Sequence, residues 1–242
     1  MSRIVTCIMR ISSICLPTNV SLAIAAAIFV AAGILLVFVI NLIWSQRILR
    51  SLHPHIGWHP ALSVAFKALY VFIVLTLVIN ITATVQSFYT LRPRTRKIDR
   101  SLQLYGTTFF AIVSSLPILV VLLSLAIPRR GAHDRFGAGR LRAKITVLLL
   151  GSSLATLGAW YRCGTTWKDP VPKTEPLPGY FHKACFYLFN FTLDIMIVYF
   201  YALMRVDLRF HVPDGAKGPR SYGKQPSQDA EEKGREPGFG EA

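Results

Sequence analysis

The sequence predicts an all-α fold, a polytopic transmembrane helical bundle of five spans plus an N-terminal half-helix. Of the 242 residues, 52% are hydrophobic and 16% are charged, whereas a soluble domain has about 25% charged residues. The charged residues also leave long gaps: residues 11–46, 68–91, 101–128 and 145–161 carry no charge, and residues 184–204 carry only Asp194. These runs reach or approach the roughly 20 residues that cross about 30 Å of hydrocarbon. None of them alternates polar and apolar residues with period 2, which argues against strands.

Residues 1–19 are expected to form a partial helix, the remnant of an upstream span. Apolar residues recur there at helical spacing, from Ile4 through Ile8 to Cys15, but Arg10 interrupts them and Pro17 ends them. The apolar run that follows is too long for the hydrophobic region of a secretory signal, so a retained span is expected.

Residues 20–211 are expected to hold the five membrane helices. The spans are predicted near 20–44, 63–88, 103–127, 144–161 and 181–204. The fourth is the shortest and contains Gly151, Ser152, Ser153 and Gly158. The basic stretches between them, including residues 89–100 and 128–144, are predicted to be loops.

Residues 212–242 are predicted to be a disordered tail, because this segment is rich in Gly, Pro, Glu and Lys and has almost no large apolar residue. The net charge of +15 comes largely from the connections between apolar runs. Phospholipid headgroups and the positive-inside rule explain such sites better than nucleic acid does, so the lipid bilayer is the expected partner and nucleic acid is not. The basic loop 128–144 and the tail favour a cytosolic C-terminus, in either the plasma membrane or an internal membrane.

The last span carries a polar stripe around Asp194. Its members recur at steps of three, four or seven residues and therefore fall on one helix face: Lys183, Tyr187, Asn190, Asp194, Tyr201 and Arg205. A charged Asp near the bilayer centre costs roughly 2.5–3.5 kcal/mol, so this face is expected to meet other helices or a wet cavity.

Polar residues of the other spans are the expected hydrogen-bonding partners of this stripe: Asn41, Thr76, Asn80, Thr82, Thr84, Ser114, Ser115, Ser152 and Ser153. Asp194, Asn190, Asn80 and Asn41 are the candidate intramembrane site residues. Two interpretations stay open. These groups are interhelical contacts that stabilise packing, or Asp194 belongs to an ion, proton or ligand site.

Three histidines, His53, His55 and His59, follow the first span. His55 and His59 have the i, i+4 spacing of helical metal ligands, but Pro54, Gly57 and Pro60 argue against a regular helix. A solvated interfacial loop anchored by Trp58 is expected instead. No catalytic motif is present, so neither enzyme activity nor a cofactor or metal is expected. Free cysteines are expected rather than a Cys163–Cys185 bridge.

Three stretches resemble a family of fungal multi-span membrane proteins that are sometimes labelled family C-like G-protein-coupled receptors. They are residues 17–60, residues 183–215 and the intervening "ITATVQSFYTL", and the resemblance extends over most of residues 4–215. It implies a seven-helix arrangement, of which this chain lacks the first span and part of the second, and it places loop 128–144 and the tail in the cytosol. Neither a D-R-Y triplet nor an N-P-x-x-Y sequence is present.

The expected function is that of a multi-pass membrane protein with a receptor-like role, in which loop 128–144 and the tail contact a cytosolic protein. The alternative is a transporter of a small solute, ion or proton that uses Asp194 and Asn190. The chain shows no internal repeat of the kind found in many secondary transporters.

Overall fold

The computed structural model describes residues 2–16, 19–90, 92–128, 136–168, 183–212 and 222. These residues form helices and no strand, which confirms the all-α prediction. The helices are α1 (Ser2–Cys15), α2 (Val20–Leu52), α3 (Pro54–Gly57), α4 (Pro60–Tyr89), α5 (Pro93–Ala126), α6 (Leu141–Trp167), α7 (Lys183–Tyr187), the π-helix η2 (Leu188–Thr192), α8 (Leu193–Leu203) and α9 (Val206–Arg209).

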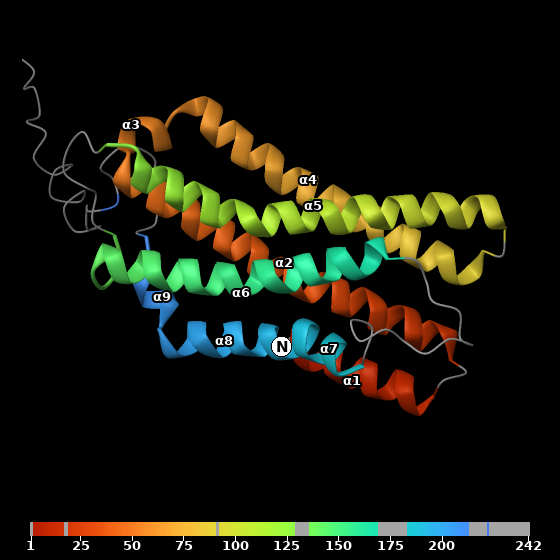
Figure 1. Cartoon of the computed structure of the whole chain (residues 1–242). Coiled ribbons are helices and arrows are strands. Elements are labelled where there is room, and N and C mark those ends of the chain that lie inside the picture. Colours follow the sequence, from red (N-terminus) through yellow and green to blue (C-terminus); the bar gives the residue numbers. More distant parts are fainter. Residues whose placement is uncertain are drawn as a thin grey trace, which may run out of the picture.

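Five segments of the described chain are long and apolar enough to cross a membrane: α2, α4, α5, α6 and the continuous α7–η2–α8 segment. Figure 1 shows them as one bundle, in which α2 packs against α4, α5 and α6, and α8 lies beside α6. Large apolar side chains cover the outside, among them Val71, Phe72 and Leu75 of α4. The protein is therefore an integral, multi-pass membrane protein whose outer surface suits a lipid bilayer.

The helices extend beyond the predicted spans. Helix α2 continues to Leu52, α6 continues to Trp167, and α5 begins at Pro93, so the prediction of a loop over residues 93–100 is wrong. The physical reason is that a helix satisfies its own backbone hydrogen bonds, while long Arg and Lys side chains reach water from helical positions beyond the hydrocarbon. A charge therefore marks the edge of the hydrocarbon and not the end of the helix.

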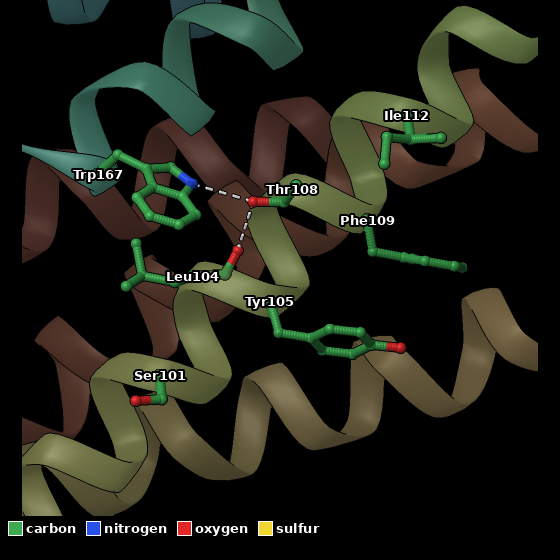
Figure 2. Close-up of a pocket in the computed structure, with 7 residues that line it drawn as sticks. All are labelled: Ser101, Leu104, Tyr105, Thr108, Phe109, Ile112 and Trp167. Atoms are coloured by element: carbon green, nitrogen blue, oxygen red, sulfur yellow. Dashed lines mark hydrogen bonds between the residues drawn. The ribbon is translucent and has the colours of Figure 1, made fainter.

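Helices α5 and α6 are joined by hydrogen bonds along their length. Thr156 Oγ1 donates to the Ser114 carbonyl (2.8 Å), and Trp160 Nε1 donates to Ser115 Oγ (3.1 Å). Nearer the C-terminal end of α6, Trp167 Nε1 donates to Thr108 Oγ1 at 3.0 Å (Figure 2). These partners order the two helices in antiparallel register.

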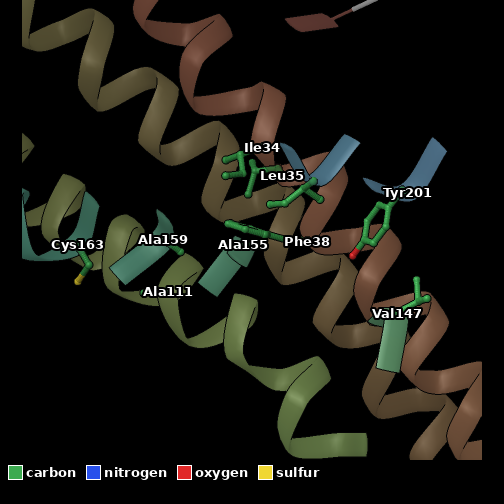
Figure 3. Packing of buried hydrophobic residues seen from close by; sticks show 10 residues of the cluster. Ile34, Leu35, Phe38, Ala111, Val147, Ala155, Ala159, Cys163 and Tyr201 are labelled. Atoms are coloured by element: carbon green, nitrogen blue, oxygen red, sulfur yellow. The ribbon is translucent and has the colours of Figure 1, made fainter. Parts of the chain in front are cut away.

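The main apolar core lies where α2, α5, α6 and α8 meet (Figure 3). Phe38 and Leu35 of α2 pack toward Ala155 and Ala159 of α6. Small side chains at these positions let the helix backbones approach closely, as is common between membrane helices.

Helix α1 packs against α2, with the buried Thr6 Oγ1 donating to the Phe29 carbonyl (3.3 Å). Its Arg10 guanidinium lies 5.6 Å from the centroid of the Phe186 ring of α7. At 14 residues, about 21 Å, α1 is shorter than the hydrocarbon core. Its assignment as the remnant of an upstream span stays a prediction.

The predicted tail lies almost entirely outside the described residues. Its Tyr222 is described, and the buried ring packs against Trp58 and Phe136, with centroid distances of 5.7 Å and 5.8 Å.

Candidate functional site

Asp194 of α8 forms an ion pair with Arg162 of α6. The Arg162 Nη2 and Asp194 Oδ2 atoms are 3.5 Å apart, and the two side chains are 19% and 2% exposed. Asp194 stands midway along the span Ala184–Leu203, about 15 Å from either end. The prediction that the Asp194 face meets other helices agrees with this position, and the positive charge of Arg162 offsets part of the cost of burying the carboxylate.

Arg162 reaches Asp194 because of the direction of helix side chains. It lies five residues before the end of α6, about 8 Å inside the helix terminus. Side chains on a helix point back toward its N-terminus, which for α6 is toward the middle of the bundle. The guanidinium therefore extends inward, and the pair links α6 to the middle of the segment Ala184–Leu203.

A π-helix, η2, precedes Asp194 and carries Asn190. The Leu193 N–H donates to the Leu188 carbonyl, the i to i+5 pattern of a widened turn. Asn190 is buried, and its Nδ2 donates to the Phe186 carbonyl (2.9 Å). Single π-turns inside α-helices are frequent at functional sites.

The widened turn packs directly against α6. The Phe189 ring stacks on Tyr161 with centroids 4.3 Å apart, and a Cβ on Gly158 would lie 3.1 Å from the Phe189 carbonyl oxygen. The glycine therefore allows the close approach that brings Arg162 and Asp194 together.

The π-turn also corrects the predicted polar stripe. One extra residue in a turn rotates the preceding residues by about 100° relative to an ideal helix. Tyr187 is accordingly exposed, whereas Asn190, Asp194 and Tyr201 are buried. Arg205 is exposed in a left-handed conformation (φ 46°) after α8 ends, and the Lys183 side chain lies outside the described part.

Asn41 and Asn80 lie away from the Asp194 pair. Asn41 Oδ1 accepts a hydrogen bond from the Tyr201 hydroxyl (2.6 Å), and Tyr201 is seven residues, about 10 Å, beyond Asp194. Asn80 of α4 is half-buried opposite Gly106 of α5. A Cβ added at Gly106 would lie 3.1 Å from the Cγ atom of Asn80. Of the four candidates, only Asn190 and Asp194 lie near each other, as two buried residues four positions apart in the same segment.

The hydroxyl partners expected for Asp194 hydrogen-bond to their own helices instead. Ser114 Oγ donates to the Ala111 carbonyl and Ser152 Oγ to the Leu148 carbonyl. Thr82 and Thr84 likewise donate to carbonyls four residues earlier. Helix geometry explains this, because a hydroxyl reaches a carbonyl one turn back without leaving its own helix.

Two charged residues that the structure places inside the bundle, Arg162 and Asp99, were not among the predicted site residues. Arg162 fell just outside the predicted fourth span, and Asp99 fell in the predicted loop over residues 89–100. Asp99 is 2% exposed on α5, and its Oδ2 has no hydrogen-bond partner among the described residues. Its spacing of seven from the buried Gly106 is the signal that places both on one helix face.

The histidine cluster is divided between burial and solvent. His53 is buried, and its Nε2 lies 2.8 Å from the Ser124 carbonyl oxygen, so the expectation of a solvated loop is wrong at this position. His55 and His59 are exposed, and His59 Nδ1 accepts from the Ala61 N–H at the start of α4. Within the described ranges, no three His, Cys, Asp or Glu side chains are grouped to hold a metal ion. No disulfide bond joins Cys7, Cys15, Cys163 or Cys185.

Residues 138–211 match a protein-family model described as "Protein of unknown function (DUF3112)". No curated protein and no solved structure matches the chain. The matched segment extends from the approach to α6 through α9 and includes both Arg162 and Asp194. In this segment, the multi-pass membrane protein is similar to a family whose function is unknown.

Proposed function

We propose that the chain is a receptor-like, multi-pass membrane protein of fungal type and not an enzyme. The Arg162–Asp194 pair holds α6 and α8 in one arrangement, and a ligand that separates the pair changes the surface offered to a cytosolic partner. The observation that carries this proposal is that α6 and α8 are linked by the Arg162–Asp194 ion pair and again, through their flanking segments, at one end of the bundle.

The second link joins the segment before α6 to the helix after α8. The Ala138 N–H donates to the Leu208 carbonyl of α9 (2.9 Å), and Gly137 packs against the Arg209 backbone. Lys144 Nζ donates to the carbonyls of Phe136 and Gly137 and so fixes this segment to α6. Movement of α8 relative to α6 would therefore be transmitted to the described part of loop 128–144.

The charges at this end suit an acidic cytosolic partner. Arg140, Arg142 and Arg205 are exposed there, and the positive-inside rule favours the cytosol for such a surface. The resemblance to proteins labelled family C-like G-protein-coupled receptors supports the receptor-like role. Residues 129–135 of the loop and nearly all of the tail, also expected to contact the partner, lie outside the described residues.

The test is the accessibility of a single cysteine at the exposed Ala138, in a chain whose four native cysteines are replaced by alanine. We expect Asp194→Asn to raise the maleimide labelling rate at Ala138→Cys at least about fivefold, a typical allosteric coupling. The control Asp207→Asn removes an exposed carboxylate of α9 and is expected to leave the rate unchanged. Equal maleimide labelling rates at Ala138→Cys with and without the Asp194→Asn change, at equal protein abundance, would contradict the proposal.

A transporter is the alternative, favoured by the buried Asp194 beside a π-turn that carries Asn190. Intramembrane carboxylates are common in proton and ion pathways. In this case, protein reconstituted in vesicles would move protons or cations, and Asp194→Asn would abolish the flux. Absence of flux together with changed Ala138 labelling would favour the receptor-like role.

A further inference from the structure

An outward-facing groove lies along the first half of α5, bordered at one side by the end of α6 (Figure 2). Its volume is about 460 Å³. Ser101 stands nearest the start of α5, and the remaining lining comes from Leu104, Tyr105, Thr108, Phe109 and Ile112 of α5 and Trp167 of α6. From Ser101 to Ile112 the helix rises about 16 Å, close to half of the hydrocarbon core and thus to one leaflet.

Hydrogen bonds and ring packing hold the walls of the groove in place. The Trp167 indole donates to Thr108 Oγ1, which in turn donates to the Leu104 carbonyl at 2.8 Å (Figure 2). The rings of Tyr105 and Phe109 are stacked with centroids 6.1 Å apart. Tyr105 and Trp167 are nevertheless 51% and 58% exposed, so the groove presents fixed aromatic surface to lipid.

Two cations continue the same face of α5 beyond the groove. Lys97 is four residues and Arg94 seven residues before Ser101. Both therefore lie between Ser101 and the start of α5, on the same side of the helix. Ser101 Oγ donates to the Lys97 carbonyl. Both basic side chains are exposed and form no ion pair with a described residue. The nearest carboxylate on the helix, Asp99, is buried.

We propose that this groove binds one anionic phospholipid. One acyl chain lies along Tyr105, Phe109 and Trp167, and the phosphate is held by Lys97 and Arg94 at the membrane surface. Charge complementarity selects this occupant over a neutral lipid, because two exposed cations stand one and two turns from the point where the apolar lining ends. Aromatic residues at this depth provide the amphipathic surface found at membrane interfaces.

The experiment is tryptophan quenching in phosphatidylcholine vesicles that contain a minor fraction of phosphatidylglycerol brominated on its acyl chains. We expect quenching several-fold above that from the same fraction of brominated phosphatidylcholine. Trp167→Phe is expected to remove this excess, which assigns the signal to the groove. The double change Arg94→Gln, Lys97→Gln should remove most of the excess, because roughly 1 kcal/mol for each of two basic residues corresponds to about 30-fold weaker binding.

Two further variants separate loss of binding from misfolding. The charge-preserving pair Arg94→Lys, Lys97→Arg is expected to keep the excess quenching. The control Lys67→Gln removes an exposed charge from α4 and is also expected to keep it. Equal quenching by the two brominated phospholipids, or stronger quenching by a brominated sterol that is insensitive to Arg94 and Lys97, would overturn the proposal.

Discussion

The contact between α6 and α8 differs between its two halves. In one half, Gly151 of α6 packs directly against Tyr201, and the Tyr201 hydroxyl donates to Asn41 Oδ1. The ring centroids of Trp44 and Tyr201 are 5.0 Å apart in a T-shaped arrangement. In the other half, the contact is the Arg162–Asp194 ion pair beside a π-turn. The first half is stabilised by close packing around Tyr201, and the second by an ion pair. Protonation or a bound ion can separate a charged pair without a steric clash, so we expect the second half to respond to ligands while the first stays closed.

Removing the Arg162–Asp194 ion pair should have the largest effect on the free energy of unfolding. Arg162→Met removes the cation that contacts the buried Asp194 carboxylate, and we expect the free energy of unfolding to fall by about 3 kcal/mol. Thermal unfolding of the purified protein in detergent measures this. The control is Arg142→Met, on the exposed side of the same helix. The double variant Arg162→Met, Asp194→Leu should regain most of the stability. Equal unfolding temperatures for Arg162→Met and Arg142→Met would mean that the pair contributes nothing.

Disrupting the packing of Gly151 against Tyr201 should lower the free energy of unfolding somewhat less. The Cβ of Gly151→Ala would overlap the Tyr201 ring, and such overpacking typically costs about 2 kcal/mol. Gly164→Ala is a matched control, because no heavy atom lies within 4 Å of a Cβ at this position of the same helix. The measurement is again thermal unfolding, with Ala138 labelling as a second readout. A Gly151→Ala protein as stable as Gly164→Ala would show that the helices separate easily at this point.

The smallest effect is expected from the hydroxyl of Tyr201. Tyr201→Phe keeps the ring against Gly151 but leaves Asn41 Oδ1 without its donor, at a cost of about 1 kcal/mol. Tyr199→Phe, at a 64% exposed position on α8, should be neutral. The unfolding temperatures of the two variants sharpen the comparison by separating ring packing from hydrogen bonding. A Tyr201→Phe effect as large as that of Gly151→Ala would place the main stabilisation in the hydrogen bond.

The fold class was predictable because uncharged runs of span length admit few other structures. Helix ends were not, since α2, α5 and α6 continue past the charges that bound the apolar runs. Asp194 was identifiable from the cost of burying a carboxylate, but its partner was not, because Arg162 stood one residue beyond a span predicted to end at 161. The π-turn at 188–192 cannot be recognised from polar residues spaced by three, four or seven positions. For this reason Tyr187 was predicted on the wrong helix face.

The Arg162–Asp194 pair has an electrical consequence. As a neutral unit, it experiences almost no net force from the transmembrane voltage. A carboxylate that loses its cation, or an arginine that loses its carboxylate, becomes a charge inside the field, where a full crossing is worth about 2.3 kcal/mol per 100 mV. Opening this contact would let the two opposite charges move separately, so that the relative position of α6 and α8 would become sensitive to membrane potential.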